Sequence, residues 1–181
     1  MDSTFRQLLR HEVTLQRPVS GTTAGGNVTG VTYEDVYADA QPARIVPVRT
    51  LLSGGILGAF PEATHVLYCE PLDLKAGYRV ERELAATALA QAAQAGDEEI
   101  AVADDTGLQQ GHVIELSAGE VTEAAEVRGV GDDLLALAGP LAHGFSVGTP
   151  VRAALRYDVL GVEDEAGAGH HLRVVLRETA L

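Results

Sequence analysis

The sequence is poor in the residues that stabilise small folds through covalent links or large contact areas. It has one cysteine, Cys69, and aromatic residues make up 4% of its 181 residues, with no tryptophan. A single cysteine excludes an intrachain disulfide and therefore a disulfide-stapled secreted fold. Alanine, valine and leucine must fill the core, and such a core buries little area per residue. We therefore expect neighbouring subunits to supply part of the stability.

Basic residues are also scarce, with 13 lysines and arginines against 26 acidic residues and a formal net charge of −13. An acidic surface repels the phosphate backbone, so tight nucleic-acid binding is disfavoured. The same charge permits double-stranded DNA to pass through a hole lined by the protein, because a like-charged lining does not hold it. The alternative is that the acidic residues only keep the protein soluble.

Long apolar runs are absent. No stretch approaches the roughly 20 apolar residues that span a bilayer. Met1–Arg10 mixes acidic and basic residues and lacks the apolar core of a signal peptide. We expect synthesis in the cytoplasm.

Motifs for catalysis and for metal or cofactor binding are missing too. The sequence has no CxxC, HExxH or GxSxG pattern and no glycine-rich phosphate loop. Glu70 follows Cys69 and should raise the pKa of its thiol, which disfavours a reactive thiolate. Acidic clusters such as Asp104–Asp105 and Asp132–Asp133 fall in expected turns, where solvated carboxylates are common. We predict no enzyme activity, no catalytic residue, no cofactor and no metal.

What the sequence does contain is short segments with strand character. A helical turn is expected over Ser3–Leu9, with Phe5, Leu8 and Leu9 on one face. Strands are expected at His11–Arg17, Val31–Ala38, Ala43–Val48, Thr64–Cys69, Tyr78–Glu81, Val151–Gly161 and His171–Glu178. Pro18 is expected to end the first strand, and Ser20–Gly30 to form a polar loop.

The composition changes at Glu83–Ala95, which is rich in alanine and is followed by Gly96. This pattern predicts a short helix. Further short strands are expected at Glu99–Ala103, His112–Leu116, Glu123–Val130 and Leu134–Leu137. The sequence therefore predicts a mainly β fold. A small antiparallel β-barrel-like domain (1–81 plus 154–181) is interrupted by an inserted β-rich module (82–153) that opens with the helix.

Five stretches in the outer segments resemble the phage head-closure proteins, also called head–tail joining, stopper or head–tail connector proteins. They are Arg10–Pro18 with Gly25–Asn27 in the following loop, Tyr33–Ile45, Thr64–Pro71, Asp73–Val80 and Arg156–Glu178. A short hairpin joins the last two in a typical family member, whereas here a long insert separates them. The insert resembles a small β module of other phage structural proteins in the ranges Ile100–Gly107, Leu108–Leu116, Glu126–Val130 and Leu135–Val151.

The resemblance implies a homo-oligomeric ring at the neck of the virion. Such a ring contacts portal or adaptor proteins on the head side and the tail terminator or tail tube on the other. It seals packaged DNA without sequence-specific binding. Arg10, Arg17 and Arg44 are candidate interface residues. A glycine-rich apolar loop is the candidate lumen or gating segment, because glycine gives the backbone freedom to change shape. Its residues are Leu51, Leu52, Gly54, Gly55, Ile56, Leu57, Gly58 and Phe60.

The same sequence is compatible with other roles for this loop and with other functions for the chain. The loop could simply pack on its own domain. The chain could be another virion part, such as a tail terminator or decoration protein, or a ligand-binding β module that recognises carbohydrate. A hydrolase with a carboxylate site would need acids that converge in a pocket.

Overall fold

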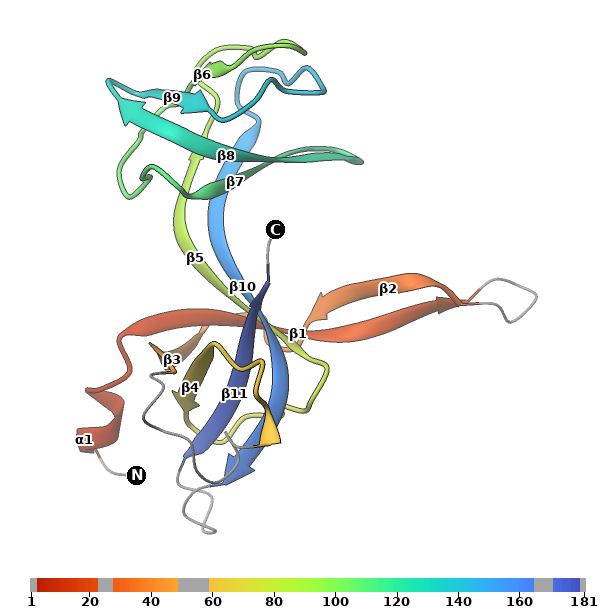
Figure 1. Cartoon of the computed structure of the whole chain (residues 1–181), viewed down its shortest axis with the longest axis vertical. Helices are drawn as coiled ribbons and strands as arrows, with labels where there is room; N and C mark the ends of the chain where they lie inside the picture. Colours follow the sequence, from red (N-terminus) through yellow and green to blue (C-terminus); the bar gives the residue numbers. More distant parts are fainter. Residues whose placement is uncertain (1–2, 23–27, 49–58, 165–170, 180–181) are drawn as a thin grey trace. The chain divides into compact units, whose positions relative to one another are not determined.

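The computed structural model describes residues 3–22, 28–48, 59–164 and 171–179 (Figure 1). Strands account for 59% of the protein and helix for 2%, so the predicted mainly β fold is confirmed. The chain divides into two compact units. The barrel unit comprises Met1–Arg82 with Arg156–Ala180, and the inserted module comprises Glu83–Leu155. The sequence analysis places the inserted module at residues 82–153, within two residues of the bounds seen in the structure.

Six strands form a closed antiparallel ring, which confirms the predicted barrel. The ring runs β1–β3–β4–β11–β10–β5 and returns to β1. The strands are β1 (His11–Thr22), β3 (Gln41–Pro47), β4 (His65–Cys69), β5 (Arg79–Ala88), β10 (Pro150–Asp164) and β11 (Leu172–Thr179). The ring closes because β10 pairs with both β5 and β11.

Two distant stretches of chain lie side by side in this barrel. The N–H of Val159 donates to the carbonyl of Tyr78, and the N–H of Gly77 donates to the carbonyl of Val159, both at 2.8 Å. This confirms the prediction that the segments at Tyr78–Val80 and Tyr157–Val159 belong to one folded unit. The insert therefore interrupts a single barrel.

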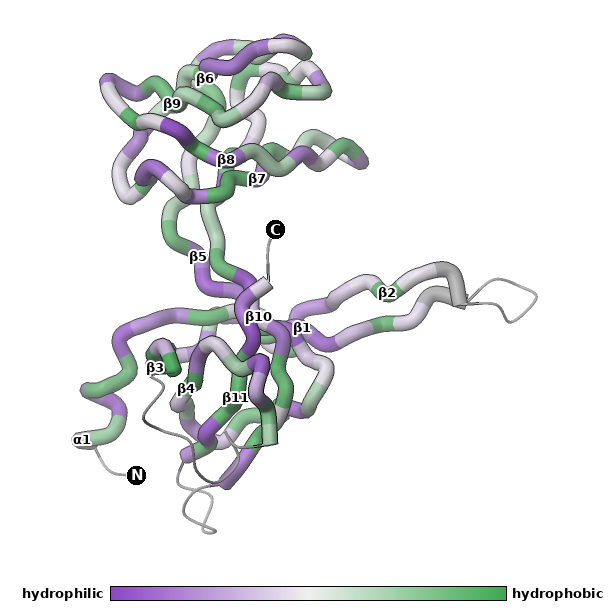
Figure 2. The backbone as a smooth tube through the Cα atoms, in the orientation of Figure 1, coloured by the Kyte–Doolittle hydropathy of each residue, from purple (hydrophilic) through white to green (hydrophobic). Residues whose placement is uncertain are grey.

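The barrel core follows from residue alternation, because successive side chains of a strand point to opposite faces. Val13 and Leu15 are buried on β1, and Ala43 and Ile45 on β3. Figure 2 shows hydrophobic and hydrophilic residues alternating along the strands. The largest fully buried side chain is Tyr157, and the rest of the core is mainly aliphatic, as the composition predicts.

The inserted module has its own core and its own strand path. Its short strands are β6 (Glu99–Ala101), β7 (Val113–Ala118), β8 (Val121–Gly131) and β9 (Leu134–Leu137). Together with parts of β5 and β10 they follow the order β5–β10–β7–β8–β9–β6. Two hydrogen bonds of 2.9 Å connect the end of β5 to the end of β6, the first and last strands in this order. They run from Ala90 N–H to Ala101 O and from Ala103 N–H to Ala88 O.

The predicted helix at Glu83–Ala95 is wrong. Strand β5 continues to Ala88, and isolated bridges then link Leu89 to Val102 and Ala93 to Phe145. Leu89 and Ala93 are buried in the module core. Helix propensity is a weak preference, and the pairing of this segment with other extended segments of the module overrides it here. Gly96, at φ +97°, serves a turn between strands and does not end a helix.

The amino-terminal part of the barrel unit carries two additions to the ring. One is the helix α1 (Ser3–Arg6), which confirms the expected helical turn. The other is β2 (Val28–Asp35), which pairs with β1 alone and lies outside the ring (Figure 1). Among the residues described, no helix has the length and apolar character needed to cross a bilayer.

Pro18 does not end β1, contrary to expectation, and strand structure extends into the predicted loop at both ends. Val36 N–H donates to Leu15 O at 2.7 Å, and the register pairs Pro18 with Tyr33. Hydrogen-bonded and non-hydrogen-bonded pairs alternate in an antiparallel ladder, so Pro18 and Tyr33 form a non-hydrogen-bonded pair. Proline removes no ladder bond at such a position.

Candidate functional site

The predicted gating loop lies almost entirely outside the described residues. This applies to Leu51, Leu52, Gly54, Gly55, Ile56, Leu57 and Gly58. Phe60 is described and is half-buried, and it packs against a cluster on the barrel around Val66 and Val175. For this one residue, packing on its own unit accounts for the apolar side chain.

The three candidate interface arginines fall into two places. Arg17 lies on β1 opposite Glu34 of β2, with 3.4 Å between Nη2 and Oε2 and both side chains more than half exposed. Arg44 is exposed on β3. Arg10 is exposed directly before β1, and the register pairs His11 with Ala43, so Arg10 and Arg44 flank the same pair of residues. Arg10 and Arg44 therefore lie next to each other at the start of the β1–β3 pairing, whereas Arg17 lies farther along β1, where β1 pairs with β2.

Arg44 lines a cavity of about 290 Å³, which we call the groove. The groove is lined by Phe5, Leu8, Leu9, Arg44, Val46 and Tyr68. The hydrophobic face expected on the amino-terminal turn thus forms one wall, and β3 and β4 form the other. None of the lining residues is acidic, so the groove combines an apolar surface with one guanidinium.

An ion pair holds the helical wall of the groove in place. Arg6 donates from Nη2 to the carboxylate of Glu70 at 3.0 Å and also donates from Nε. The side-chain hydrogen bond from Arg6 lowers the pKa of Glu70. Because Glu70 directly follows β4, this bond connects α1 to the strand that forms the opposite wall.

His11 lies beside the groove and contributes no charge at neutral pH. Its Nδ1 accepts a hydrogen bond from Ile45 N–H at 3.0 Å. Burial lowers the pKa of His11, and the charges of Arg82 and Arg44 lower it further. The positive charge at the groove therefore comes from Arg44 and Arg10.

The second candidate surface is the β1–β2 hairpin beyond the barrel, which we call the arm. It consists of Gln16–Thr22 and Val28–Asp35. At its base, the Arg79 guanidinium lies 3.7 Å from the centre of the Tyr33 ring, and Gln16 donates to Asp35 Oδ1 at 3.0 Å. The first contact joins the arm to strand β5 of the barrel, and the second joins the two strands of the arm.

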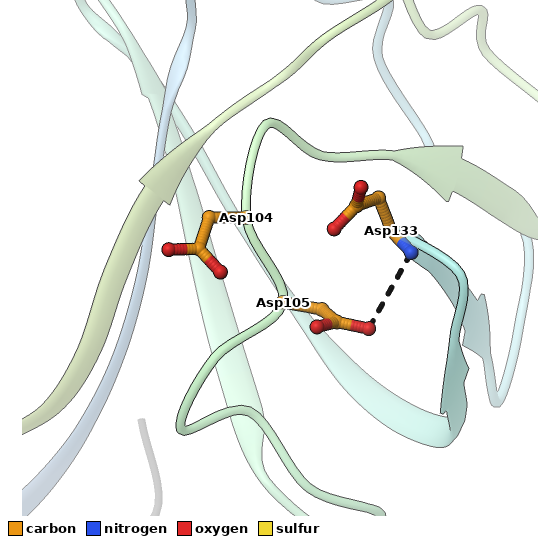
Figure 3. Close-up of side chains that lie close together, drawn as sticks. All are labelled: Asp104, Asp105 and Asp133. Atoms are coloured by element: carbon orange, nitrogen blue, oxygen red, sulfur yellow. Dashed lines mark hydrogen bonds between the residues drawn. The ribbon is translucent and has the colours of Figure 1, made fainter.

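Three carboxylates of the inserted module lie together at neighbouring turns (Figure 3). One oxygen atom of each of Asp104, Asp105 and Asp133 lies within 4.8 Å of the others. Asp133 N–H donates to Asp105 Oδ2 at 3.4 Å, and hydrogen bonds from Thr106 lower the pKa of Asp104. Oxygen ligands suit hard cations such as Ca²⁺, but Asp104 also caps its own turn and Asp105 caps the neighbouring one. Sequence reasoning found both acidic pairs but gave no sign that their turns meet.

The lone cysteine has the environment of a core residue. Cys69 is fully buried. Burial, with a smaller contribution from Glu70, raises the pKa of its thiol to about 12. The thiol is therefore protonated at neutral pH and poorly nucleophilic, which agrees with the effect predicted for Glu70. His65 lies at the opposite end of β4, near Glu178 and Tyr157.

No protein-family model matches the chain, and no curated protein is detectably similar to it in sequence.

Proposed function

We propose that the protein is a non-enzymatic structural subunit of a tailed-phage particle. Copies form a ring at the head–tail neck, where the ring seals packaged DNA in the capsid and offers a surface for tail attachment. Its partners are copies of itself, portal or adaptor proteins on the head side, and a tail terminator or tail tube on the tail side. DNA passes through without being read.

One observation carries the proposal: all five stretches that resemble head-closure proteins belong to one compact unit. Each of them contributes to a strand of the barrel or of its arm. In order they contribute to β1, to β2 and β3, to β4, to β5, and to β10 with β11. The fourth and fifth are joined directly by the hydrogen bonds between Val159 and Gly77–Tyr78. Chance matches would have no reason to fall together in one compact unit.

The charge of the chain supports the same role. A net charge of −13 disfavours a protein that holds DNA tightly but suits one that lets DNA slide past. It also creates repulsion between copies. A ring of such subunits therefore needs contacts that are apolar or locally basic.

The test is a stop codon in this gene in the phage that encodes it, with electron microscopy of the lysate. We expect heads that have lost DNA alongside free tails, and recovery of whole particles when the gene is supplied in trans. Stable DNA-filled heads with abnormally long tails would identify a tail terminator instead. Normal infectious particles would refute a role in the neck.

A further inference from the structure

We propose that the arm of one subunit lies in the groove of the next copy of the same chain. The inference rests on the proposed ring and names the surfaces that hold it together. Both surfaces belong to the barrel unit, so the contact does not depend on how the inserted module is placed.

The arm needs a partner because two strands do not make a stable sheet by themselves. Isolated hairpins are marginal in water, and a third strand or a packed face is required for stability. In the described structure β2 pairs with β1 and with no other strand. At the base of the described arm, Tyr33 lies against Arg79, and Gln16 pairs with Arg79 of β5.

The two edges of the arm differ in a way that favours pairing on one side. On the β1 edge, Pro18 has no N–H to offer, and proline is a common protection of exposed edges. On the β2 edge, ladder alternation points the N–H and C=O groups of Val31, Tyr33 and Asp35 away from β1. No described residue pairs with these groups, so they are free to meet polar side chains of a neighbour.

The exposed hydrophobic side chains of the barrel unit lie one on each proposed surface. Among the described residues of this unit, the exposed large hydrophobics are Val31 on the arm, at 55%, and Leu8 in the groove, at 44%. A single exposed valine or leucine is ordinary. Here, however, one is on a hairpin without a third strand and the other lines an open cavity.

The charges of the two surfaces are complementary. The arm carries the carboxylates of Glu34 and Asp35 against the single guanidinium of Arg17. The groove carries Arg44, with Arg10 beside it, and has no acidic lining residue. In a chain of net charge −13, a basic and apolar groove is a surface that an acidic copy can approach.

The placement of the two surfaces makes the contact head-to-tail. Within the barrel unit, α1 and the arm project from opposite sides of the barrel (Figure 1). The arm therefore cannot fill the groove of its own chain. A contact between two different surfaces of identical subunits is heterologous, and it produces a ring when the rotation closes.

Cross-linking of single-cysteine additions tests the contact in the full-length chain. Val31→Cys and Leu8→Cys chains, one carrying a mass tag, are mixed and treated with a short bismaleimide. Buried Cys69 does not compete for the reagent. We expect mixed dimers to exceed either homodimer about tenfold, and the double variant to give a ladder of covalent oligomers.

The matched control replaces Val31→Cys by Val147→Cys, which adds a more exposed cysteine in the inserted module. Mixed products no more abundant than with this control, at the highest soluble concentration, would overturn the proposal. So would a predominance of Val31–Val31 dimers, which indicates a twofold contact between β2 edges. Cross-links from Val31→Cys only to another virion protein would likewise exclude a second copy as the occupant.

A charge reversal gives a second, independent measurement. Arg44→Glu should lower the yield of the mixed product about tenfold, which corresponds to about 1.4 kcal/mol. Arg128→Glu makes the same change in charge on an exposed strand residue of the module and should leave the yield unchanged. Equal losses from both variants would show that only total charge matters. If particles assemble normally but these cross-links are absent, the interface is wrong while the proposed function stands.

Discussion

The barrel unit and the inserted module share strands and an aliphatic core, but they differ in how they complete their own surfaces. Side chains within the module hold its turns. Glu123 accepts hydrogen bonds from the N–H groups of Ala142 and His143, at 2.6 and 2.9 Å, and Asp97 accepts one from Gln94 at 2.7 Å. The barrel unit instead extends an arm whose β2 strand pairs with no third strand among the described residues, and it leaves a groove open.

Closure of the six-stranded ring therefore does not remove every unpaired strand edge from the described barrel unit. Within the ring itself every strand is paired on both sides, so the open edges of the arm are an addition to the barrel and not a consequence of it. The module has exposed hydrophobic residues too, such as Val121 at the tip of the β7–β8 hairpin and Val147. We expect the module to stand alone and the barrel unit to associate.

The largest effects should come from breaking one core and leaving the other intact. Tyr157→Ala should lower the free energy of unfolding of the barrel unit by about 3–5 kcal/mol, because a large buried side chain is lost. Leu135→Ala should lower that of the module by about 2–5 kcal/mol. Hydrogen exchange resolved by residue reports each unit separately. Tyr157→Phe, which keeps the ring, is the control, and loss of protection in both units from either alanine variant would show that they unfold together.

Two ion pairs link β5 to β10, one in each unit, and they offer a closely matched comparison. Glu81 and Arg156 pair at 2.8 Å with Glu81 almost fully buried, whereas Glu83 and Arg152 pair at 3.1 Å with both side chains exposed. Glu81→Ala should destabilise the barrel unit by about 3 kcal/mol, because it removes the buried carboxylate that accepts a hydrogen bond from the partly buried guanidinium of Arg156. Glu83→Ala should cost the module at most about 1 kcal/mol. Equal losses in urea denaturation would show that burial does not distinguish the pairs.

A smaller effect should come from the turn that Glu123 holds in the module. Burial raises the pKa of this carboxyl, but hydrogen bonds from Ala142 and His143 outweigh burial, and the net pKa lies below its usual value. The stabilisation is therefore complete above the ordinary glutamate pKa and is lost as the pH falls through the lowered one. Glu123→Gln should cost the module about 1–2 kcal/mol at neutral pH.

The pH dependence distinguishes this role from simple packing. The difference between wild type and Glu123→Gln should shrink as the pH falls below about 4, as measured by thermal unfolding. Glu120→Gln, at an exposed position of the nearby β7–β8 turn, is the control. It should change neither the stability of the module at neutral pH nor the dependence of that stability on pH. A difference in stability that stays constant down to low pH would show that the charge of the Glu123 carboxylate does not stabilise this turn.

The smallest effect should come from the ion pair on the arm. Arg17 and Glu34 are both more than half exposed. Arg17→Ala should therefore change the free energy of unfolding by less than about 0.5 kcal/mol. A loss above about 1 kcal/mol in chemical denaturation would show that this pair stabilises the arm, which would weaken the case that the arm depends on a neighbour.

Alternation of apolar and polar residues was enough to predict most of the barrel strands, whereas the split of the barrel by an insert was predicted from the change in composition at Glu83 and from the family resemblance. Val13 and Leu15 are both buried on β1, as the pattern requires. The same reasoning failed at Glu83–Ala95, because alanine fits either a helix or a closely packed strand. There the choice depends on partners from distant segments, such as Val102 and Phe145.

The candidate surfaces were only partly predictable. The hydrophobic face of the amino-terminal turn is visible in the sequence, but its meeting with Val46 and Tyr68 to form a groove depends on the register of β3 and β4. The arm was missed because Pro18 suggested the end of a strand. Only the pairing with Tyr33 shows that proline occupies a position where no hydrogen bond is lost.

The most direct measurement of the proposed function is an electron cryomicroscopy reconstruction of the neck in the tailed-phage particles that we propose contain this chain. We predict a ring of identical barrel units between portal and tail, with strand β2 of each subunit against α1, β3 and β4 of the next. Finding the chain at the tail end or on the capsid surface, or in no particle at all, would contradict the account.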